Sequence, residues 1–496
     1  MNSIQMSRQR VLTGIKGLDR VLCGGLLTGQ AYLVRGGPGM GKTTLGLHFL
    51  AEGIAQGETC LLITLGESQK QLCRNAENRG FDLSEVQFLD FSPTTEFFTQ
   101  QQNYDIFSPA EVEREPISQQ IIDCVTTYKP QRIFFDAMTQ FRYLAADEFQ
   151  FRKQVLSLLR FLVEHNATVL FTSEGYIKAP DDDLQFMSDG VIELDSTLEG
   201  RKIKISKFRG SNFSSGYHGL MLTDRGIEIY PRLLPGVYKR DFALEIVSSG
   251  IPELDELLHG GVERGTVTIL SGPSGVGKST LGLQFMKEAA GRGERSAIYV
   301  FEEAVETLLH RCEAVNIPAR IMRDRGVLSV TAIEPLEYSP DRFAYMVREE
   351  VEKYETKIVM IDSTSGYGLS IRGNDLVPHI HSLCQYLRNM GITTILINEI
   401  ETISGGDFQA TEIGLSYLAD NIVFMRYVEF DGQLRKAIGV LKKRMSDYER
   451  HLRPFEVTRY GLKVGEPLKN LRRILSGSPE LADPSESTSV SSMWHS

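Results

Sequence analysis

The sequence predicts an α/β protein with two tandem domains, each a mostly parallel β-sheet flanked by helices. The first observation is a repeat: "TGIKGLDRVLCGGLLTGQ" from Thr13 returns as "SGIPELDELLHGGVERGT" from Ser249. The offset of 236 residues holds without a gap as far as Glu67 and Glu303, so the repeat is a duplicated domain and not a short solenoid unit. The second observation is that short apolar runs alternate with helix-length segments in both copies, which is typical of parallel sheets.

The individual elements follow from these runs. In the first copy we expect buried strands over 31–36, 59–65, 132–137 and 168–174, and a helix over 43–57. The matching strands of the second copy are expected over 267–272, 296–303, 357–363 and 393–399. Each copy ends in a β-rich stretch, such as 190–210, and the seam lies near 230–240. We therefore predict domains at 1–240 and 241–475, followed by a Ser-, Pro- and acid-rich tail, 476–496, that we interpret as disordered.

Bulk composition narrows the class of protein. The chain has 496 residues, is 42% hydrophobic and 24% charged, and carries a net charge of −10, so no overall basic field favours nucleic acid as a partner. No apolar run approaches the roughly 18 residues that span a bilayer, and "MNSIQMSRQR" has no apolar signal-peptide core behind it. The six cysteines are scattered without a CxxC pair. These features predict a cytoplasmic protein without membrane association.

The loop pattern GxxxxGK[ST] occurs once in each copy, after a predicted strand and before a predicted helix. Its glycines let backbone N–H groups surround phosphate oxygens, and Lys42 and Lys278 would neutralise the β- and γ-phosphates of ATP. Two matches at homologous places exclude an accidental Gly-rich turn. The predicted ATP-binding residues of these loops are Gly36, Gly37, Pro38, Gly39, Met40, Gly41, Lys42, Thr43 and Thr44, with Gly272, Pro273, Ser274, Gly275, Val276, Gly277, Lys278, Ser279 and Thr280.

A magnesium site should accompany each loop. Thr43 and Ser279 would each give a hydroxyl to Mg²⁺. Asp136 ends the run "RIFFD" and Asp362 ends "KIVMID". An acid at the carboxyl end of a buried parallel strand lies at the ligand crevice, so these two aspartates are predicted to hold the magnesium water shell.

Hydrolysis of ATP, or transfer of its γ-phosphate, also needs a base that positions a water molecule or a hydroxyl group. Glu302 and Glu303 follow the next strand of the second copy, whereas the first copy has Gly66 and Glu67 at the same offset. Only one acid remains there. Both loops should bind nucleotide, but we expect the first copy to be the weaker catalyst unless Glu67 compensates.

A Lys-x-Arg pair stands near the end of each copy: Lys207 with Arg209, and Lys442 with Arg444. Solvated surface charge is the ordinary interpretation of such pairs. Their occurrence in both copies favours a role in ATP binding, in which they reach the γ-phosphate of a neighbouring subunit as an arginine finger does.

The repeated motifs together resemble the KaiC family. They include "TGIKGLD" and "GGPGMGKTT", the "FEE" after the next strand, "ATVLFTSE", "KFRGS", "LTDRGIEIYP" and the closing "ILSGSP". The resemblance covers nearly the whole chain, from about residue 13 to 479, in the same domain order. It implies two RecA-like P-loop domains, as in the double-domain ATPase and autokinase of the cyanobacterial circadian clock.

The resemblance also implies an assembly and a reaction. Such proteins form a homohexamer of two stacked rings with ATP at subunit interfaces; the first ring is a slow ATPase that governs capture of a small KaiB partner. The second ring phosphorylates its own Ser/Thr pair, with the first of its two acids, here Glu302, as base. The acceptor segment corresponds to "TEIGLSYLADNIVFMRYVE", which places Ser416 and Tyr417 at the two sites and Thr411 at a third hydroxyl position.

Three residues depart from the family pattern. Gly66 replaces the first acid of the first ring, Tyr417 stands where the family has Thr or Ser, and Met445 follows the second Lys-x-Arg where the family has Gly. Two other functions stay open on the sequence alone: a RecA-type DNA-dependent ATPase, which the acidic charge disfavours, and a nucleotide-gated scaffold with little catalysis, which Gly66 favours for the first ring only.

Overall fold

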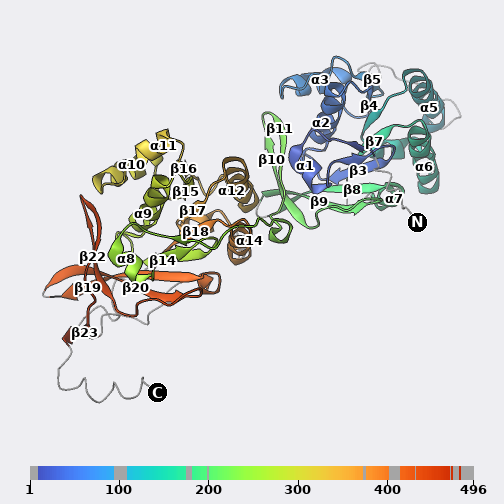
Figure 1. Ribbon diagram of the computed structural model, residues 1–496. Helices are drawn as coiled ribbons and strands as arrows, with labels where there is room; N and C mark the ends of the chain where they lie inside the picture. The colour runs from blue at the N-terminus through green and yellow to red at the C-terminus, as the bar shows by residue number, and fades with distance from the viewer. Residues whose placement is uncertain are drawn as a thin grey trace, which may run out of the picture. The chain divides into compact units, whose positions relative to one another are not determined.

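A computed structural model describes residues 9–93, 109–174, 181–197, 200–371, 376–400, 414–430, 432–469, 471–472 and 480–481. The chain divides into two compact units, Met1–Arg232 and Leu233–Ser496. Each unit is built around one nine-stranded sheet with helices on its faces (Figure 1). The predicted α/β class with two tandem, mostly parallel sheets is confirmed.

The first sheet has the strand order β11-β10-β9-β8-β3-β7-β6-β4-β5. The six strands from β8 to β5 are parallel, and β9, β10 and β11 extend the sheet by antiparallel pairing. The strands are β3 (Ala31–Gly36), β4 (Cys60–Thr64), β5 (Gln87–Asp90), β6 (Arg132–Asp136), β7 (Thr168–Glu174), β8 (Gly190–Thr197), β9 (Gly200–Phe208), β10 (Tyr217–Thr223) and β11 (Gly226–Tyr230), with a small pair β1 (Arg10–Val11) and β2 (Leu26–Leu27).

Helices cover both faces of this sheet (Figure 1). They are α1 (Lys16–Val21), α2 (Lys42–Ala55), α3 (Gln69–Glu77), α5 (Pro109–Tyr128), η1 (Met138–Leu144), α6 (Glu148–Glu164) and α7 (Asp182–Met187). Successive residues of a strand point to opposite faces, so Leu62 packs in the core beside α2 while Leu61 and Ile63 pack in the core beside α6. Burial on both faces explains why these strands are continuous apolar runs in the sequence.

The second unit repeats this arrangement with the order β16-β15-β17-β18-β14-β19-β20-β21-β22. Its strands are β14 (Val267–Gly272), β15 (Ser296–Val300), β16 (Leu328–Ala332), β17 (Ile358–Asp362), β18 (Thr393–Glu399), β19 (Asn421–Phe430), β20 (Gln433–Lys443), β21 (Arg453–Thr458) and β22 (Gly461–Val464), with the short strands β12 (Ile246–Val247), β13 (Val262–Glu263), β23 (Leu471–Arg472) and β24 (Glu480–Leu481). Again the strands from β16 to β19 are parallel and the rest antiparallel.

The helices of the second unit are η2 (Pro235–Val237), α8 (Pro252–Leu257), α9 (Lys278–Gly291), α10 (Val305–Ala314), α11 (Ala319–Asp324), α12 (Pro340–Tyr354), α13 (Thr364–Leu369), α14 (Leu376–Asn389) and η3 (Leu415–Tyr417). Within the described part of the chain, no helix is both long and apolar enough to cross a membrane. In both units the central strand, β3 or β14, runs directly into the Gly-rich loop. The loop therefore lies at the carboxyl edge of the parallel strands, where α/β proteins bind ligands.

Candidate functional site

The loop between β14 and α9 is shaped as a phosphate cradle. Gly277 has a φ of +119°, a left-handed conformation that glycine adopts without strain, and α9 begins at the next residue. The Nζ atom of Lys278 donates hydrogen bonds to the backbone oxygens of Gly272 and Pro273, both at 2.8 Å. Burial lowers the pKa of this lysine, and the nearby carboxylates, Glu399 first among them, oppose that fall. The ammonium thus faces the inside of the loop, where phosphate oxygens can accept its bonds.

The oxygen donors expected for magnesium lie together beside this loop. Asp362 ends β17, and the hydroxyl of Ser279 donates a hydrogen bond to its carboxylate. Burial raises the pKa of Asp362, and this hydrogen bond opposes the rise. A hydroxyl and a carboxylate are ligands that Mg²⁺ prefers. No group of three or more His, Cys, Asp or Glu that could hold a metal occurs among the described residues, so nucleotide phosphates and water would complete the shell.

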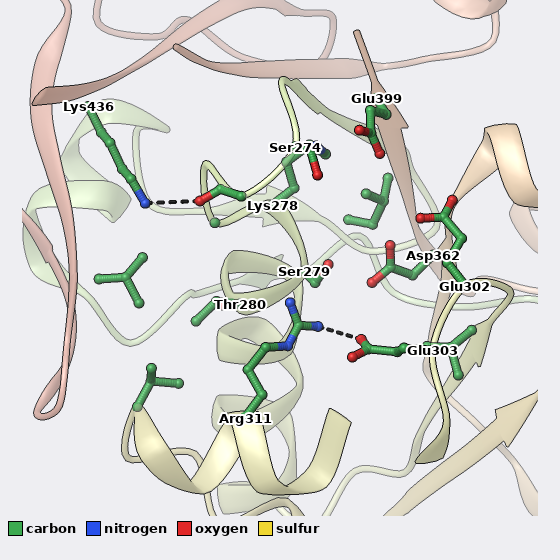
Figure 2. Close-up of a pocket in the computed structure, with 16 residues that line it drawn as sticks. Ser274, Lys278, Ser279, Thr280, Glu302, Glu303, Arg311, Asp362, Glu399 and Lys436 are labelled. Carbon is green, nitrogen blue, oxygen red and sulfur yellow. Dashed lines mark hydrogen bonds and ion pairs between the residues drawn. The ribbon is translucent and has the colours of Figure 1, made fainter. Parts of the chain in front are cut away.

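A cavity of about 470 Å³ opens in front of this loop, and Figure 2 shows the side chains that line it. Glu302 accepts a hydrogen bond from the hydroxyl of Ser363, the residue after Asp362. Glu303 is held differently: Arg311, from α10, donates to its Oε1 atom at 2.6 Å. The full lining is Ser274, Gly275, Gly277, Lys278, Ser279, Thr280, Val300, Glu302, Glu303, Arg311, Val315, Asp362, Ile397, Glu399, Lys436 and Val457.

The first unit builds the same cradle between β3 and α2. The Nζ atom of Lys42 donates to the backbone oxygens of Gly36 at 2.7 Å and Gly37 at 3.0 Å. The hydroxyl of Thr43 donates to Asp136 Oδ2 at 2.7 Å. The donor set for phosphate and Mg²⁺ is therefore the same in both units.

The base region of the two units differs. Gly66 leaves open space, because nothing lies within 4 Å of where its Cβ would be. Glu67 accepts a hydrogen bond from Asn75 Nδ2 at 3.3 Å, and burial raises the pKa of Glu67. Asp136 is followed by Ala137, which has no hydroxyl to position a base at 66. The first site has thus lost both the first acid and the side chain that would hold it.

Four residues near the two loops were not among those predicted from the sequence. Glu174 and Glu399 end β7 and β18 and are paired in register with Gly36 and Gly272, the first glycines of the two loops. The final E of "TVLFTSE" and "TTILINE" was the signal that could have found them. The other two, Arg311 and Lys436, enter the second cavity from α10 and β20 and match no local motif.

The Lys-x-Arg pair of the second unit lies at the edge of the sheet opposite its own loop. Arg444 forms an ion pair with Asp420 at 3.5 Å, and Asp420 accepts a hydrogen bond from the backbone N of Val267, where β14 begins. β14 has six residues, so its beginning lies five residue steps, or about 16 Å, from its end at the loop. Lys442 donates to the backbone oxygen of Ser416 at 2.8 Å, also on this edge.

The first unit has the same arrangement. Arg209 forms an ion pair with Asp189 at 3.7 Å, and Asp189 accepts from the backbone N of Ala31, where β3 begins. Lys207 donates to the backbone oxygens of Gln185 and Ser188. Neither pair lies in the cradle of its own unit.

The predicted acceptor residues lie beside the second pair. Ser416 and Tyr417 belong to the short helix η3, and both are exposed. Arg444 donates to the backbone oxygen of Tyr417 at 3.1 Å, and the Tyr417 ring stacks on His381 with 6.0 Å between centroids. The third predicted hydroxyl, Thr411, lies outside the described residues, as does most of the tail 476–496.

Comparison with known proteins decides the family. A family model described as ATPase: KaiC matches residues 11–233 and again residues 247–469. The chain belongs to the KaiC ATPase family. Both units are therefore KaiC-type ATPase domains, and nucleotide binding follows from that membership.

Curated KaiC relatives match over nearly the full chain. The circadian clock oscillator protein KaiC of Parasynechococcus marenigrum (strain WH8102) is 28% identical, over 99% of this chain and 96% of its own length. Circadian clock protein KaiC3 of Synechocystis sp. is 27% identical over 98% of this chain and 97% of its own. The circadian clock oscillator protein KaiC of Synechococcus elongatus is 27% identical, with 99% and 95% covered.

Proposed function

We propose that this protein assembles with ATP and Mg²⁺ into a homohexamer, hydrolyses ATP, and phosphorylates itself on Ser416 in the second domain. In this way it would act as a signalling timer or switch. The names of its relatives make a circadian rhythm the first possibility to test. A small KaiB-like protein is the partner that the family resemblance implies.

The observation that carries the proposal is the separation of donor and acceptor within one chain. Lys278 lies at the carboxyl edge of β14, whereas Ser416, Lys442 and Arg444 lie at the opposite edge, about 16 Å away along the strand. A hydroxyl at that distance cannot attack a γ-phosphate in its own cradle. A ring in which this edge meets the cradle of the next subunit brings them together and gives both cations a phosphate to bind.

The chain's own residues support the chemistry. In the proposed step, Glu302 accepts the proton of the Ser416 hydroxyl as its oxygen attacks the γ-phosphorus, and ADP is the leaving group. The carboxylate of Glu302 already accepts a hydrogen bond from one serine hydroxyl, Ser363. Mg²⁺ held through Ser279 and Asp362 would neutralise charge on the phosphates.

The test is a mixing experiment with γ-labelled ATP and mapping of the labelled residue. Ser416→Ala chains have no acceptor, and Glu302→Gln chains have no base, so neither should be labelled alone. Mixed hexamers should be labelled on Ser416 of the Glu302→Gln chains, because a neighbour supplies the base. Label on Tyr417 only, or normal labelling of Glu302→Gln chains alone, would contradict both assignments. Light scattering with an ATP analogue tests assembly, and a monomer at saturating nucleotide would exclude the ring.

A further inference from the structure

The two acids of the second site have different partners. Glu302 accepts from a neutral hydroxyl, that of Ser363, whereas Glu303 accepts from the guanidinium of Arg311 at 2.6 Å. In Figure 2 this arginine reaches from α10 into the cavity and points toward Glu303. The pairing leaves Glu302 able to exchange one hydroxyl for another, while one oxygen of Glu303 is engaged by a fixed positive charge.

The first site carries a weaker version of the same contact. The repeat aligns Glu67 with Glu303 and Asn75 with Arg311. Asn75 also donates to its glutamate, but as a neutral amide and at 3.3 Å. The duplicated position therefore keeps the direction of the hydrogen bond in both units and adds a charge only in the second.

We propose that Arg311 is a positioning residue that restrains Glu303 and so biases the second site toward phosphoryl transfer and away from hydrolysis. This rests on the proposed autokinase function. In hydrolysis, a carboxylate accepts a proton from water while the water oxygen attacks the γ-phosphorus and ADP leaves, so inorganic phosphate is released. Transfer uses a serine hydroxyl in place of water. A site with two free acids can activate both nucleophiles, whereas a site with one restrained acid favours the nucleophile that Glu302 serves.

The physical basis of the restraint is electrostatic as well as geometric. A cation beside a carboxylate lowers its affinity for a proton, which makes it a poorer base. Burial raises the pKa of Glu303, and Arg311 opposes that rise. In the first site burial raises the pKa of Glu67, and the charge of Asp136 raises it further, without an arginine to oppose them. Glu67 therefore lacks the cation that restrains Glu303.

The experiment follows both fates of the γ-phosphate in one reaction of the full-length chain. A Glu67→Gln background reduces hydrolysis at the first site, and labelled inorganic phosphate and labelled protein are then counted together. Arg311→Asn installs the side chain of the first unit, and Arg311→Lys keeps the charge. Arg320→Asn is the matched control, because Arg320, on α11, pairs with Glu306 and Glu313 of α10, and none of the three lines the cavity.

Arg311→Asn should raise the ratio of phosphate released to phosphate transferred by about five-fold, the factor that corresponds to the interaction energy of a partly exposed ion pair. Arg311→Lys and Arg320→Asn should leave the ratio within about two-fold of the parent, since the charge at the contact is kept or the contact is untouched. Adding Glu303→Gln to Arg311→Asn should return the ratio to the parent value. The ratio should rise through faster phosphate release, which partial unfolding cannot produce, and not through a fall in labelling alone.

Three results would overturn the inference. If Arg311→Asn weakens ATP binding and lowers both products together, the arginine binds phosphate. If the ratio still rises when Glu303→Gln is added, Arg311 does not act through Glu303. If Arg311→Asn leaves the ratio unchanged, Arg311 does not restrain Glu303. A parent protein that releases phosphate but never labels itself would contradict the proposed autokinase; the effect of Arg311→Asn on phosphate release would still test the restraint.

Discussion

Restoring the missing acid of the first site should require two substitutions, not one. Gly66 can accept a side chain, because its φ is outside the left-handed region and nothing lies within 4 Å of the Cβ position. A glutamate there would occupy the place that Glu302 has in the second unit. Its carboxylate would still lack a hydroxyl partner, since Ala137 stands where Ser363 donates to Glu302. Gly66→Glu with Ala137→Ser rebuilds the pair.

The size of the effect follows from these contacts. A well-placed general base contributes about 10²–10⁴-fold to a rate. A hydrogen bond to a charged group is worth about 1.5–3 kcal/mol, and each 1.4 kcal/mol is about ten-fold, so an unheld carboxylate forfeits roughly one to two powers of ten. At the lower end of the general-base range, about 10²-fold, Gly66→Glu alone should raise first-site hydrolysis by about ten-fold at most. The double variant should reach about 100-fold.

Phosphate release from the full-length chain measures this, with Glu302→Gln and Glu303→Gln silencing the second site. The control is Gly66→Gln with Ala137→Ser, which has the same shape without a base. Equal acceleration by the glutamine control would show that the cavity shape, and not a base, limits the rate. No acceleration by the double variant, with ATP binding intact, would refute the assignment of this position to the catalytic base.

Three further outcomes are expected. Burial lowers the pKa of His48 to about 4, and its Nε2 atom accepts a hydrogen bond from the backbone N of Ile227. Below about pH 6.5 the unfolded chain therefore binds more protons than the folded chain, so this residue should reduce the free energy of unfolding of the first unit by about 2 kcal/mol at pH 5. The loss should be absent at pH 7, and His48→Gln should remove it in urea titrations. Lys42→Ala should weaken ATP-driven assembly in light scattering more than Lys278→Ala if nucleotide in the first ring of the proposed hexamer holds the subunits together. Tyr417→Thr should add a second labelled residue to phosphosite maps. The hydroxyl of threonine lies close to the backbone, whereas that of tyrosine would extend past the γ-phosphate.

The central strands could be predicted from sequence because they are buried on both faces. The runs at 31–36, 168–174, 267–272 and 393–399 match β3, β7, β14 and β18 residue for residue. A continuous apolar run between turn signals leaves little choice of structure. The antiparallel strands β10, β11, β21 and β22 mix buried with partly or fully exposed residues, so they do not form continuous apolar runs. The sequence therefore predicted only a β-rich ending and not their number or register.

The residues of the candidate site also fall into two groups, those that local motifs predict and those that they do not. The loops, Asp136 and Asp362 follow from local motifs at strand ends, and the structure places each beside its hydroxyl partner. The contact of Ser363 with Glu302 could not be predicted, because it joins elements that are distant in the chain. The contact of Arg311 with Glu303 is local, but it matches no motif that would indicate it. The repeat loses its constant offset between Glu67 and Asp136, but the runs that end at Asp136 and Asp362 restore the alignment, and the sheet register agrees with it.

The two sites differ at two positions that change together, and this pairing allows ATP affinity and the rate of proton transfer to be altered independently. Where the second unit has Glu302 and Arg311, the first has Gly66 and Asn75, so the exchange removes one carboxylate and one guanidinium together. The net charge that these positions present to a nucleotide is unchanged. Phosphate affinity depends on that charge and on the shared cradle, whereas proton transfer depends on the acids themselves. Exchanging both positions should therefore change the rate while the ATP affinity stays close to that of the parent.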